Sequence, residues 1–310
     1  MPQHDRLIIA VGDLVWDVLV KPDSELLPGG DTTGAIQLAP GGSAANVAAW
    51  IARAAMPAGF IGAVGRDLFG DLIIADLERE GVVLHAPRTA ERDTGVILAL
   101  IAANGQRSMV TNQGADFRLY PADLPQQMLR QAAHVHITAW SLFSDPPRAA
   151  AIEAANAAHR AGATVSFDPA SFQMINELGV EAFRAVTAAL PVDILFPNRD
   201  EAQALTGLVE PAAMAQALRE IYPQALVAIK LDRDGCFVAA ADHVAHYPAA
   251  AVAEVVDTTG AGDAFNGVFL AHYIRTRDYA TAAHFANHAG AWVVARLGAR
   301  PPIDEALRCS

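Results

Sequence analysis

The chain contains the heptad Asp257-Thr258-Thr259-Gly260-Ala261-Gly262-Asp263, directly before the helix-forming run Ala264-Phe265-Asn266-Gly267-Val268-Phe269-Leu270. The two glycines let backbone N–H groups approach an anion, and the start of a helix adds the positive end of its dipole. Inside such an anion hole, the carboxylate of Asp263 can take a proton from an acceptor hydroxyl. The heptad therefore indicates phosphoryl transfer, in which the Gly-Ala-Gly turn holds the transferred group.

Each part of the heptad also has a purely structural interpretation. An aspartate in the first turn stabilises a helix end, and glycine often precedes helices. The complete heptad is more specific than either feature alone. We therefore expect Asp263 to be the general base and the backbone of residues 260–263 to be the anion hole.

A second motif, Gly41-Gly42-Ser43-Ala44-Ala45-Asn46-Val47-Ala48, lies near the amino end. The two motifs, in this order, resemble the two signatures of the ribokinase-like (PfkB) sugar kinase family. Three shorter stretches agree with the same family: Gly12-Asp13-Leu14-Val15-Trp16-Asp17, Pro197-Asn198-Arg199-Asp200-Glu201 and Gly298-Ala299. The resemblance therefore spans almost the whole chain.

The resemblance implies an α/β fold, a ribokinase-like three-layer α/β/α sandwich with a mainly parallel central sheet and a small β-sheet lid. It also implies an ATP-dependent sugar kinase that uses Mg²⁺ and transfers the γ-phosphoryl group to a primary hydroxyl of a small sugar. Helical and strand runs alternate along the sequence, which independently favours a parallel sheet with helices on both faces.

Two segments, at about 18–38 and 94–110, depart from this alternation. The first is rich in Pro, Gly, Asp and Thr with short strand-like pieces, and the second has the pattern of a pair of strands. In the second, Asn104-Gly105 stands between two apolar runs, which is a strong hairpin signal. We infer a small separate sheet beside the active site. The resemblance makes this sheet a lid over the sugar and a surface for homodimerisation, and residues 1–310 are expected to form one kinase domain with this discontinuous lid.

Composition limits the partners. The chain has 310 residues, is 53% hydrophobic and carries a net charge of −12, which disfavours binding to nucleic acid. Its apolar runs are shorter than a membrane span, and the amino end lacks a signal-peptide pattern. The two cysteines show neither metal-ligand spacing nor a disulfide framework. We expect a cytoplasmic protein that binds a sugar and ATP but neither nucleic acid nor membranes.

A sugar site needs short polar side chains and close backbone approach. The family's sugar contacts map onto Asp17, Gly42 and Asn46, whose oxygen and nitrogen atoms suit hydroxyl groups. Asp13 is a further candidate, although it and Asn46 also suit capping roles. Arg107, after the hairpin turn, is placed to reach a polar or anionic substrate group.

Asn198 and Glu201 are three residues apart at the start of a helical run, so they share a face and can order Mg²⁺ and its waters. The same spacing is that of a capping box, and the two roles are compatible. The resemblance assigns this pair to the metal near the nucleotide phosphates, and places Asn287 in the adenine pocket. The family usually has a Lys-x-Gly-x-x-Gly-like turn beside the nucleotide, where this chain reads Lys230-Leu231-Asp232-Arg233-Asp234-Gly235, with Asp232 in place of a glycine. A solvated surface lysine is the alternative, and we leave Lys230 out of the site.

The resemblance also places Asp257 and Thr259 at a monovalent cation site. The matching carboxyl-terminal loop reads Gly298-Ala299-Arg300-Pro301-Pro302, with proline where ribokinases proper often have a serine. This difference argues against activation by K⁺. His284 and His288, four apart on a helix, have no third ligand in the sequence, so we interpret them as packing or surface residues.

Other functions remain as alternatives. A nucleoside kinase of the same fold needs an aromatic surface for the base, for which Trp16 and Trp140 are the candidates. A non-catalytic sugar-binding protein would keep Asp17 and Asn46 without needing Asp263. The Gly-x-Gly-x-x-Gly pattern of dinucleotide enzymes and the P-loop motif are both absent from the sequence.

Overall fold

The computed structural model describes residues 6–101, 107–304 and 307, without the side chain of Arg107. These described residues form a nine-stranded central sheet with the order β15-β14-β13-β12-β11-β10-β1-β4-β6. Neighbours from β13 to β6 are parallel, and β14 and β15 are added antiparallel at one edge. The strands are Ile8–Val11 (β1), Ala58–Ile61 (β4), Val83–His85 (β6), His134–Thr138 (β10), Thr164–Asp168 (β11), Ile194–Leu195 (β12), Leu226–Lys230 (β13), Cys236–Ala239 (β14) and Val244–Tyr247 (β15).

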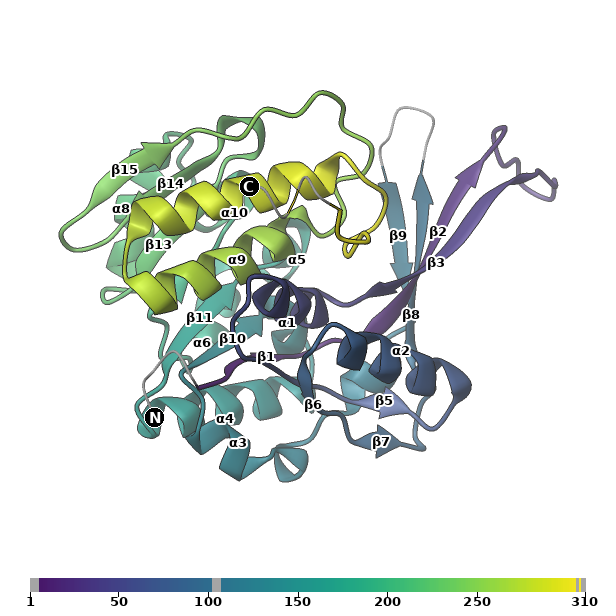
Figure 1. Ribbon diagram of the computed structural model, residues 1–310, viewed down its shortest axis with the longest axis horizontal. Coiled ribbons are helices and arrows are strands. Elements are labelled where there is room, and N and C mark those ends of the chain that lie inside the picture. Colours follow the sequence, from purple (N-terminus) through teal and green to yellow (C-terminus); the bar gives the residue numbers. More distant parts are fainter. Residues whose placement is uncertain (1–5, 102–106, 305–306, 308–310) are drawn as a thin grey trace.

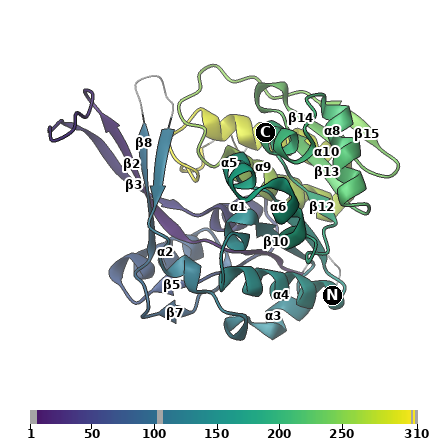
Figure 2. The same ribbon diagram turned by 180° about the vertical axis from the view of Figure 1, so that it is seen from behind.

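Helices cover both faces of this sheet, and the residues on both sides of its central strands are buried. One face carries α1 (Ser43–Arg53), α2 (Leu68–Arg79), α9 (Ala261–Thr276) and α10 (Tyr279–Val294). The other face carries α3 (Gln126–Arg130), α4 (Pro147–Arg160), α5 (Phe172–Leu178), α6 (Val180–Thr187), α7 (Arg199–Thr206) and α8 (Pro211–Ile221). Figure 1 shows α9 and α10 lying side by side on the first face, and Figure 2 shows α3 to α6 on the second. The predicted three-layer sandwich is confirmed.

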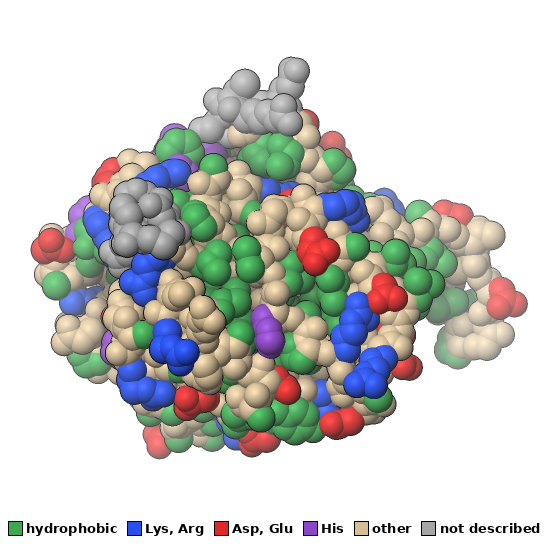
Figure 3. Space-filling model, turned by 60° about the horizontal axis from the view of Figure 1, so that its bottom comes forward, with side chains coloured by type: hydrophobic (Ala, Val, Ile, Leu, Met, Phe, Trp, Pro, Cys, Tyr) green, Lys and Arg blue, Asp and Glu red, His purple; other side chains and the backbone are tan. Residues whose placement is uncertain are grey.

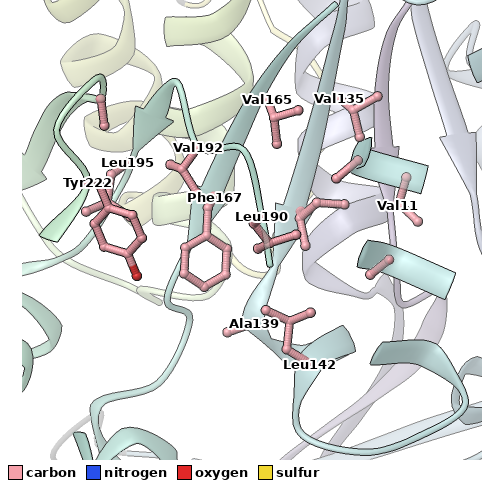
Figure 4. Packing of buried hydrophobic residues seen from close by; sticks show 14 of the residues in the cluster. Val11, Val135, Ala139, Leu142, Val165, Phe167, Leu190, Val192, Leu195 and Tyr222 are labelled. Atoms are coloured by element: carbon pink, nitrogen blue, oxygen red, sulfur yellow. The ribbon is translucent and has the colours of Figure 1, made fainter. Parts of the chain in front are cut away.

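Alternate residues of β1 and β13 belong to different cores. In β1, Ile8 and Ala10 pack toward α1 and α9, whereas Ile9 and Val11 pack into the opposite cluster. Figure 4 shows this second cluster, with Val135 and Val165 from neighbouring strands beside Phe167 and Leu190. The nearly continuous apolar strand runs seen in the sequence therefore reflect burial on both faces.

A four-stranded sheet of the order β3-β2-β8-β9 stands beside the main body in the described part of the chain. Its strands are Val15–Pro22 (β2), Gly34–Gly41 (β3), Gly95–Ile101 (β8) and Arg107–Thr111 (β9). Both predicted segments therefore form one small sheet, and the strands extend three residues beyond the limits expected for the first segment. The predicted turn at Asn104-Gly105 lies outside the described residues.

Shorter elements complete the fold. Val64–Gly65 (β5) pairs with Arg88–Thr89 (β7), and short 3₁₀ turns occur at Ala115–Arg118 (η2), Pro121–Asp123 (η3), Ala139–Leu142 (η4) and Asp232–Asp234 (η5). Among the described residues, no helix has the length and apolar character needed to cross a membrane. Positive and negative side chains are interspersed on the face drawn in Figure 3.

Candidate active site

A cavity of about 1440 Å³ lies where the parallel strands end. Asp13 follows β1, Asp168 ends β11 and Lys230 ends β13, and all three line the cavity. The small sheet supplies part of another wall through Ile97 and Met109. The carboxyl edge of a parallel sheet is the usual ligand site of open α/β folds, because strand ends and helix starts converge there.

The predicted base, Asp263, lies in the first turn of α9 and lines the cavity. Its Oδ1 accepts a hydrogen bond of 2.7 Å from Ser43 Oγ, and its Oδ2 accepts one of 2.8 Å from Asn46 Nδ2. Burial raises the pKa of Asp263 to about 7, although these two hydrogen bonds oppose the shift. A carboxyl group with this pKa is suited to exchange protons near neutral pH.

The turn before Asp263 has the geometry of an anion site. Gly260 has a left-handed conformation with φ 74°, and a Cβ at this position would lie 2.3 Å from the Cβ of Ala299. The turn leads directly into the amino end of α9, where the helix dipole favours negative charge. A Cβ at Gly262 would lie 3.6 Å from Nζ of Lys230, so an ammonium group also faces this turn.

The Gly41-Gly42 pair lets the start of α1 approach two carboxylates. A Cβ on Gly41 would meet Oδ1 of Asp17 at 2.3 Å, and a Cβ on Gly42, whose φ is 93°, would meet the carbonyl oxygen of Asp13 at 2.5 Å. The carboxylate of Asp13 accepts hydrogen bonds from the backbone N–H groups of Ser43 and Ala44, at 2.8 and 2.9 Å. Asp13 thus caps α1 while it lines the cavity.

The predicted sugar contacts converge beside Asp263. Asp17 and Asn46 are only 4% and 3% exposed, and both line the cavity together with Gly42. Asn46 donates to Asp263, while its Oδ1 has no hydrogen-bond partner among the described residues. The side chain of Arg107, a further predicted contact, lies outside the described residues.

Lys230 and Asp168 form a buried ion pair that the sequence analysis missed. Nζ of Lys230 lies 2.6 Å from Oδ2 of Asp168, which also accepts a hydrogen bond from Nδ2 of Asn266. Although burial opposes the shift, the Lys230 ammonium holds the pKa of Asp168 below its usual value. Of the two interpretations of Lys230, the solvated surface lysine is wrong, because the side chain is only 13% exposed and lines the cavity.

Asn198 and Glu201 form the predicted capping box at the start of α7. Asn198 Oδ1 accepts from the Glu201 N–H, and Glu201 Oε2 accepts from the Asn198 N–H, each at 2.8 Å. Burial, followed by the charge of Asp168, raises the pKa of Glu201 to about 8. Both side chains also line the cavity, so the structural role does not remove them from the site.

Asn287 lines the far end of the cavity, on α10. Its Nδ2 donates hydrogen bonds to the carbonyl oxygens of Tyr247 and Pro248, at 3.2 and 3.0 Å. The side chain therefore fixes the segment that follows β15. His284 and His288, on the same helix, have ring centroids 4.5 Å apart, and the described residues contain no group of three or more His, Cys, Asp and Glu side chains that could hold a metal ion.

The predicted cation site contains a network of hydrogen bonds. Oδ1 of Asp257 accepts from the N–H and the hydroxyl of Thr259, at 2.9 and 2.6 Å. Oδ2 of Asp257 accepts from the N–H of Gly298 at 2.9 Å. Asp257 therefore links the heptad to the carboxyl-terminal loop that the sequence analysis had paired with it.

Comparisons with known proteins agree with this geometry. The model of the pfkB family of carbohydrate kinases matches residues 5–306. The chain belongs to this family. It is 35% identical over 297 residues to the ATP-dependent ribose-1-phosphate kinase of Halopiger xanaduensis, which covers 94% of this chain and 93% of the relative. It is 30% identical to fructokinase-1 of Oryza sativa subsp. japonica, over 98% of this chain and 96% of the relative.

A solved structure supports the same family. The adenosine kinase from Sinorhizobium meliloti superimposes with a TM-score of 0.87 at 25% identity, covering 98% of each chain. The protein is therefore an ATP-dependent carbohydrate kinase of the pfkB family, as the resemblance implied.

Proposed function

We propose that this pfkB kinase transfers the γ-phosphoryl group of ATP to a primary hydroxyl of a small sugar, with Asp263 as general base. The observation that supports this proposal is the placement of Asp263, which Ser43 and Asn46 hold at the start of α9. The acceptor hydroxyl lies against Asp263, which removes its proton as the oxygen attacks phosphorus. The N–H groups of residues 260–263 and the helix dipole stabilise the charge of the transferred group.

The nucleotide end of the cavity supplies the remaining charge. Lys230 faces the glycine turn and offers a cation to the phosphates, while Asp168 fixes the position of its ammonium group. Asn287 orders the segment that borders the proposed base site. These contacts hold the donor in line with the acceptor, which is the main requirement of phosphoryl transfer.

Mg²⁺ is the proposed metal. The carboxylate of Glu201 and the amide oxygen of Asn198 are hard oxygen donors that line the cavity, which suits Mg²⁺. Because both groups are already hydrogen-bonded within the capping box, we propose that they hold the ion through water. Bound Mg²⁺ would neutralise charge on the phosphates.

The test is a panel of acceptors with ATP and Mg²⁺, read by ADP release. The panel contains fructose, ribose, ribose 1-phosphate and adenosine, with a reaction lacking acceptor as the control. ADP release that depends on a sugar supports the proposal, and the absence of release with every sugar would refute it.

A nucleoside kinase remains the second candidate, and one observation favours it. Trp140, which follows β10, lines the cavity and offers an aromatic face for a base. Trp16 is not suited to this role, because its Nε1 donates to the carbonyl oxygen of Phe69 at 3.0 Å and its ring packs against Phe69. Trp140→Ala should reduce turnover of adenosine more than that of ribose if a base stacks there.

We also propose a homodimer that is joined through the four-stranded sheet. Leu38, Val18, Leu98 and Val110 are paired in one row across its four strands, on the face opposite Asp17. Leu38 and Val110 are more than half exposed. The end of the β2–β3 arm stands away from the body in Figure 3, so this apolar face is available to a second copy.

Sedimentation of wild type and Leu38→Glu tests the dimer. We expect the variant to sediment as a monomer, whereas Val209→Glu, a matched change at an exposed site after α7, should leave the dimer intact. A wild-type protein that is monomeric at micromolar concentration would refute the interface. Slower amide exchange in residues 15–41 when sugar is bound would support the further proposal that this sheet closes as a lid.

Monovalent cations and location complete the proposal. Because Asp257 itself joins Thr259 to Gly298, we propose that turnover does not require K⁺. Equal rates in KCl, NaCl and choline chloride at one ionic strength would support this, and strong activation by KCl alone would refute it.

The cytoplasmic location remains a prediction, which fractionation of the source cells would test.

A further inference from the structure

Asp116 is a cavity-lining carboxylate that the sequence analysis did not identify. It lies in η2, is 9% exposed, and shares the cavity wall with Asp13. Burial, followed by the charge of Asp13, raises the pKa of Asp116 to about 7, while Arg92 opposes this shift. The side chain therefore belongs to the same end of the cavity as the proposed sugar contacts.

The surrounding backbone makes room for this carboxylate. A Cβ on Gly95 would lie 2.4 Å from Oδ1 of Asp116, and a Cβ on Gly114 would lie 2.5 Å from Cα of Gly95. Two glycines thus bring the carboxylate against the start of β8. Despite its burial, Oδ1 of Asp116 accepts no hydrogen bond from the described residues. A buried acceptor in this state is costly unless a ligand or water donates to it.

The end of the cavity that Asp13, Asp17, Asn46 and Asp116 line, where the phosphoryl acceptor is proposed to bind, is called the acceptor end. It is rich in oxygen atoms that accept hydrogen bonds. Oδ1 of Asp116 and Oδ1 of Asn46 both lack a donor among the described residues. Ser43 Oγ and one N–H of Asn46 Nδ2 donate to Asp263 and not to these two oxygens. A ligand with hydroxyl groups at this end can therefore donate to both oxygens.

The positive side chains that line the cavity lie elsewhere. Among the described residues, the lining Lys and Arg side chains are Lys230, which ends β13, and Arg199 and Arg233, which follow β12 and β13, all at the proposed nucleotide end. The acceptor end instead has four carboxylates: Asp13, Asp17, Asp116 and Asp263. An anionic group placed there would face these carboxyl groups with no lining cation of the described residues beside it, and their ionised forms would repel it.

We propose that Asp116 makes this kinase specific for uncharged, polyhydroxylated acceptors, by accepting a hydrogen bond from a hydroxyl remote from the one phosphorylated and by repelling phosphorylated sugars. This inference rests on the proposed function and names the substrate class of the same site. It separates this chain from its relative whose name gives ribose 1-phosphate as the substrate.

The test compares kcat/KM for ribose, fructose and ribose 1-phosphate, with ATP and Mg²⁺ at fixed concentrations. The better neutral sugar should exceed ribose 1-phosphate by about 100-fold or more, as expected for like-charge repulsion. Asp116→Ala should raise KM for that sugar by about tenfold or more, with KM for ATP almost unchanged, because a hydrogen bond to a charged group is lost. Asp116→Asn keeps an oxygen that accepts a hydrogen bond but has no charge. It should therefore retain much of the affinity for the sugar and reduce the ratio of kcat/KM for the neutral sugar to kcat/KM for ribose 1-phosphate.

Asp93→Asn is the matched control, because Asp93 is exposed and lies two residues before Gly95; its kinetics should equal those of the wild type. Preference for ribose 1-phosphate, or a KM unaffected by Asp116→Ala, would overturn the inference. If no acceptor releases ADP, the proposed function fails, and thermal shifts with the same three compounds still decide the inference. Stabilisation by a neutral sugar supports it, and stabilisation by ribose 1-phosphate alone or by none of the three refutes it.

Discussion

Replacing Asp263 with asparagine separates its proposed chemical role from a structural one. The amide has nearly the same shape, so its oxygen can still accept the hydrogen bond from Asn46 and its nitrogen can donate to Ser43. The first turn of α9 and the cavity wall should therefore remain in place. The substitution removes only the base.

The expected loss is large. General base catalysis contributes about 10²–10⁴-fold in rate, which corresponds to about 3–5 kcal/mol of transition-state stabilisation. Because the pKa of Asp263 is about 7, only about half of the protein carries the ionised base at pH 7. The comparison should therefore be made at pH 8, where the wild type is mostly in its active form.

The pH dependence provides a second measurement. Catalysis needs the carboxylate, so kcat/KM of the wild type should fall as the pH decreases through about 7. The free energy of unfolding should change in the opposite direction, rising as the pH decreases through about 7. The pKa of Asp263 is higher in the folded state than in the unfolded state, so ionisation of this group destabilises the fold as the pH rises. Asp263→Asn should lack this inflection in the rate and should have a melting temperature at pH 8 that is equal or higher.

The assay is ADP release with the best acceptor, combined with thermal unfolding. Asp71→Asn is the control, because Asp71 lies in the first turn of α2, is largely exposed, and pairs with Arg88 outside the cavity, so it shares the helix-end role but not the chemistry. Its turnover should match that of the wild type. If Asp263→Asn retains turnover within about tenfold of the wild type with an unchanged fold, the assignment of the base is wrong.

Three further changes test the surroundings of this base. Lys230→Met leaves the buried carboxylate of Asp168 without its ion pair, so the free energy of unfolding measured in urea should fall by about 3–5 kcal/mol. Adding Asp168→Asn to this variant should restore part of the loss. A loss below about 1 kcal/mol would contradict the buried pair. Gly42→Ala places a side chain at φ 93°, so it should lower the free energy of unfolding by about 1–3 kcal/mol and weaken binding of the sugar. The control Gly81→Ala has a similar φ of 84° but open space around it, so it should lower the free energy of unfolding without changing sugar binding. Asn198→Ala removes a helix cap worth about 0.5–2 kcal/mol and should raise the Mg²⁺ concentration needed for half-maximal rate; an unchanged Mg²⁺ dependence would limit Asn198 to capping.

The central fold was largely predictable from the sequence. The run Leu226–Ile229 is apolar, and Thr164–Phe167 is rich in β-branched and aromatic residues; both are short and form parallel strands. Strand pairing was not predictable in detail, because it depends on contacts between distant segments. The small sheet shows this: Val15 pairs with both Gly41 and Gly95, so β2 begins earlier than its own composition indicated.

The site was predictable where a motif carried it. Asp263, Asn46 and Gly42 lie within the two signatures, and the structure brings them to one cavity. Asp168 was missed and Lys230 was left out because each has a weak local pattern, and the fold brings them within hydrogen-bond distance from the ends of β11 and β13, which flank β12. A usable signal was present for Asp168, which ends an apolar strand run just as Asp13 follows one. Asp116 gave no comparable signal, because it reaches the cavity from an irregular turn.

The position of Asp263 depends on packing one turn further along α9. Gly267 is four residues after Asp263, so both lie on the same face of the helix. A Cβ at Gly267 would meet Cβ of Trp50 and the carbonyl oxygen of Val47, both at 2.7 Å. The missing side chain therefore lets α9 approach α1 closely, and α1 carries the two residues that hold the carboxylate of Asp263. The glycine is part of the catalytic geometry although it touches no substrate, because the distance between the two helices sets the distance between the base and its hydrogen-bond donors.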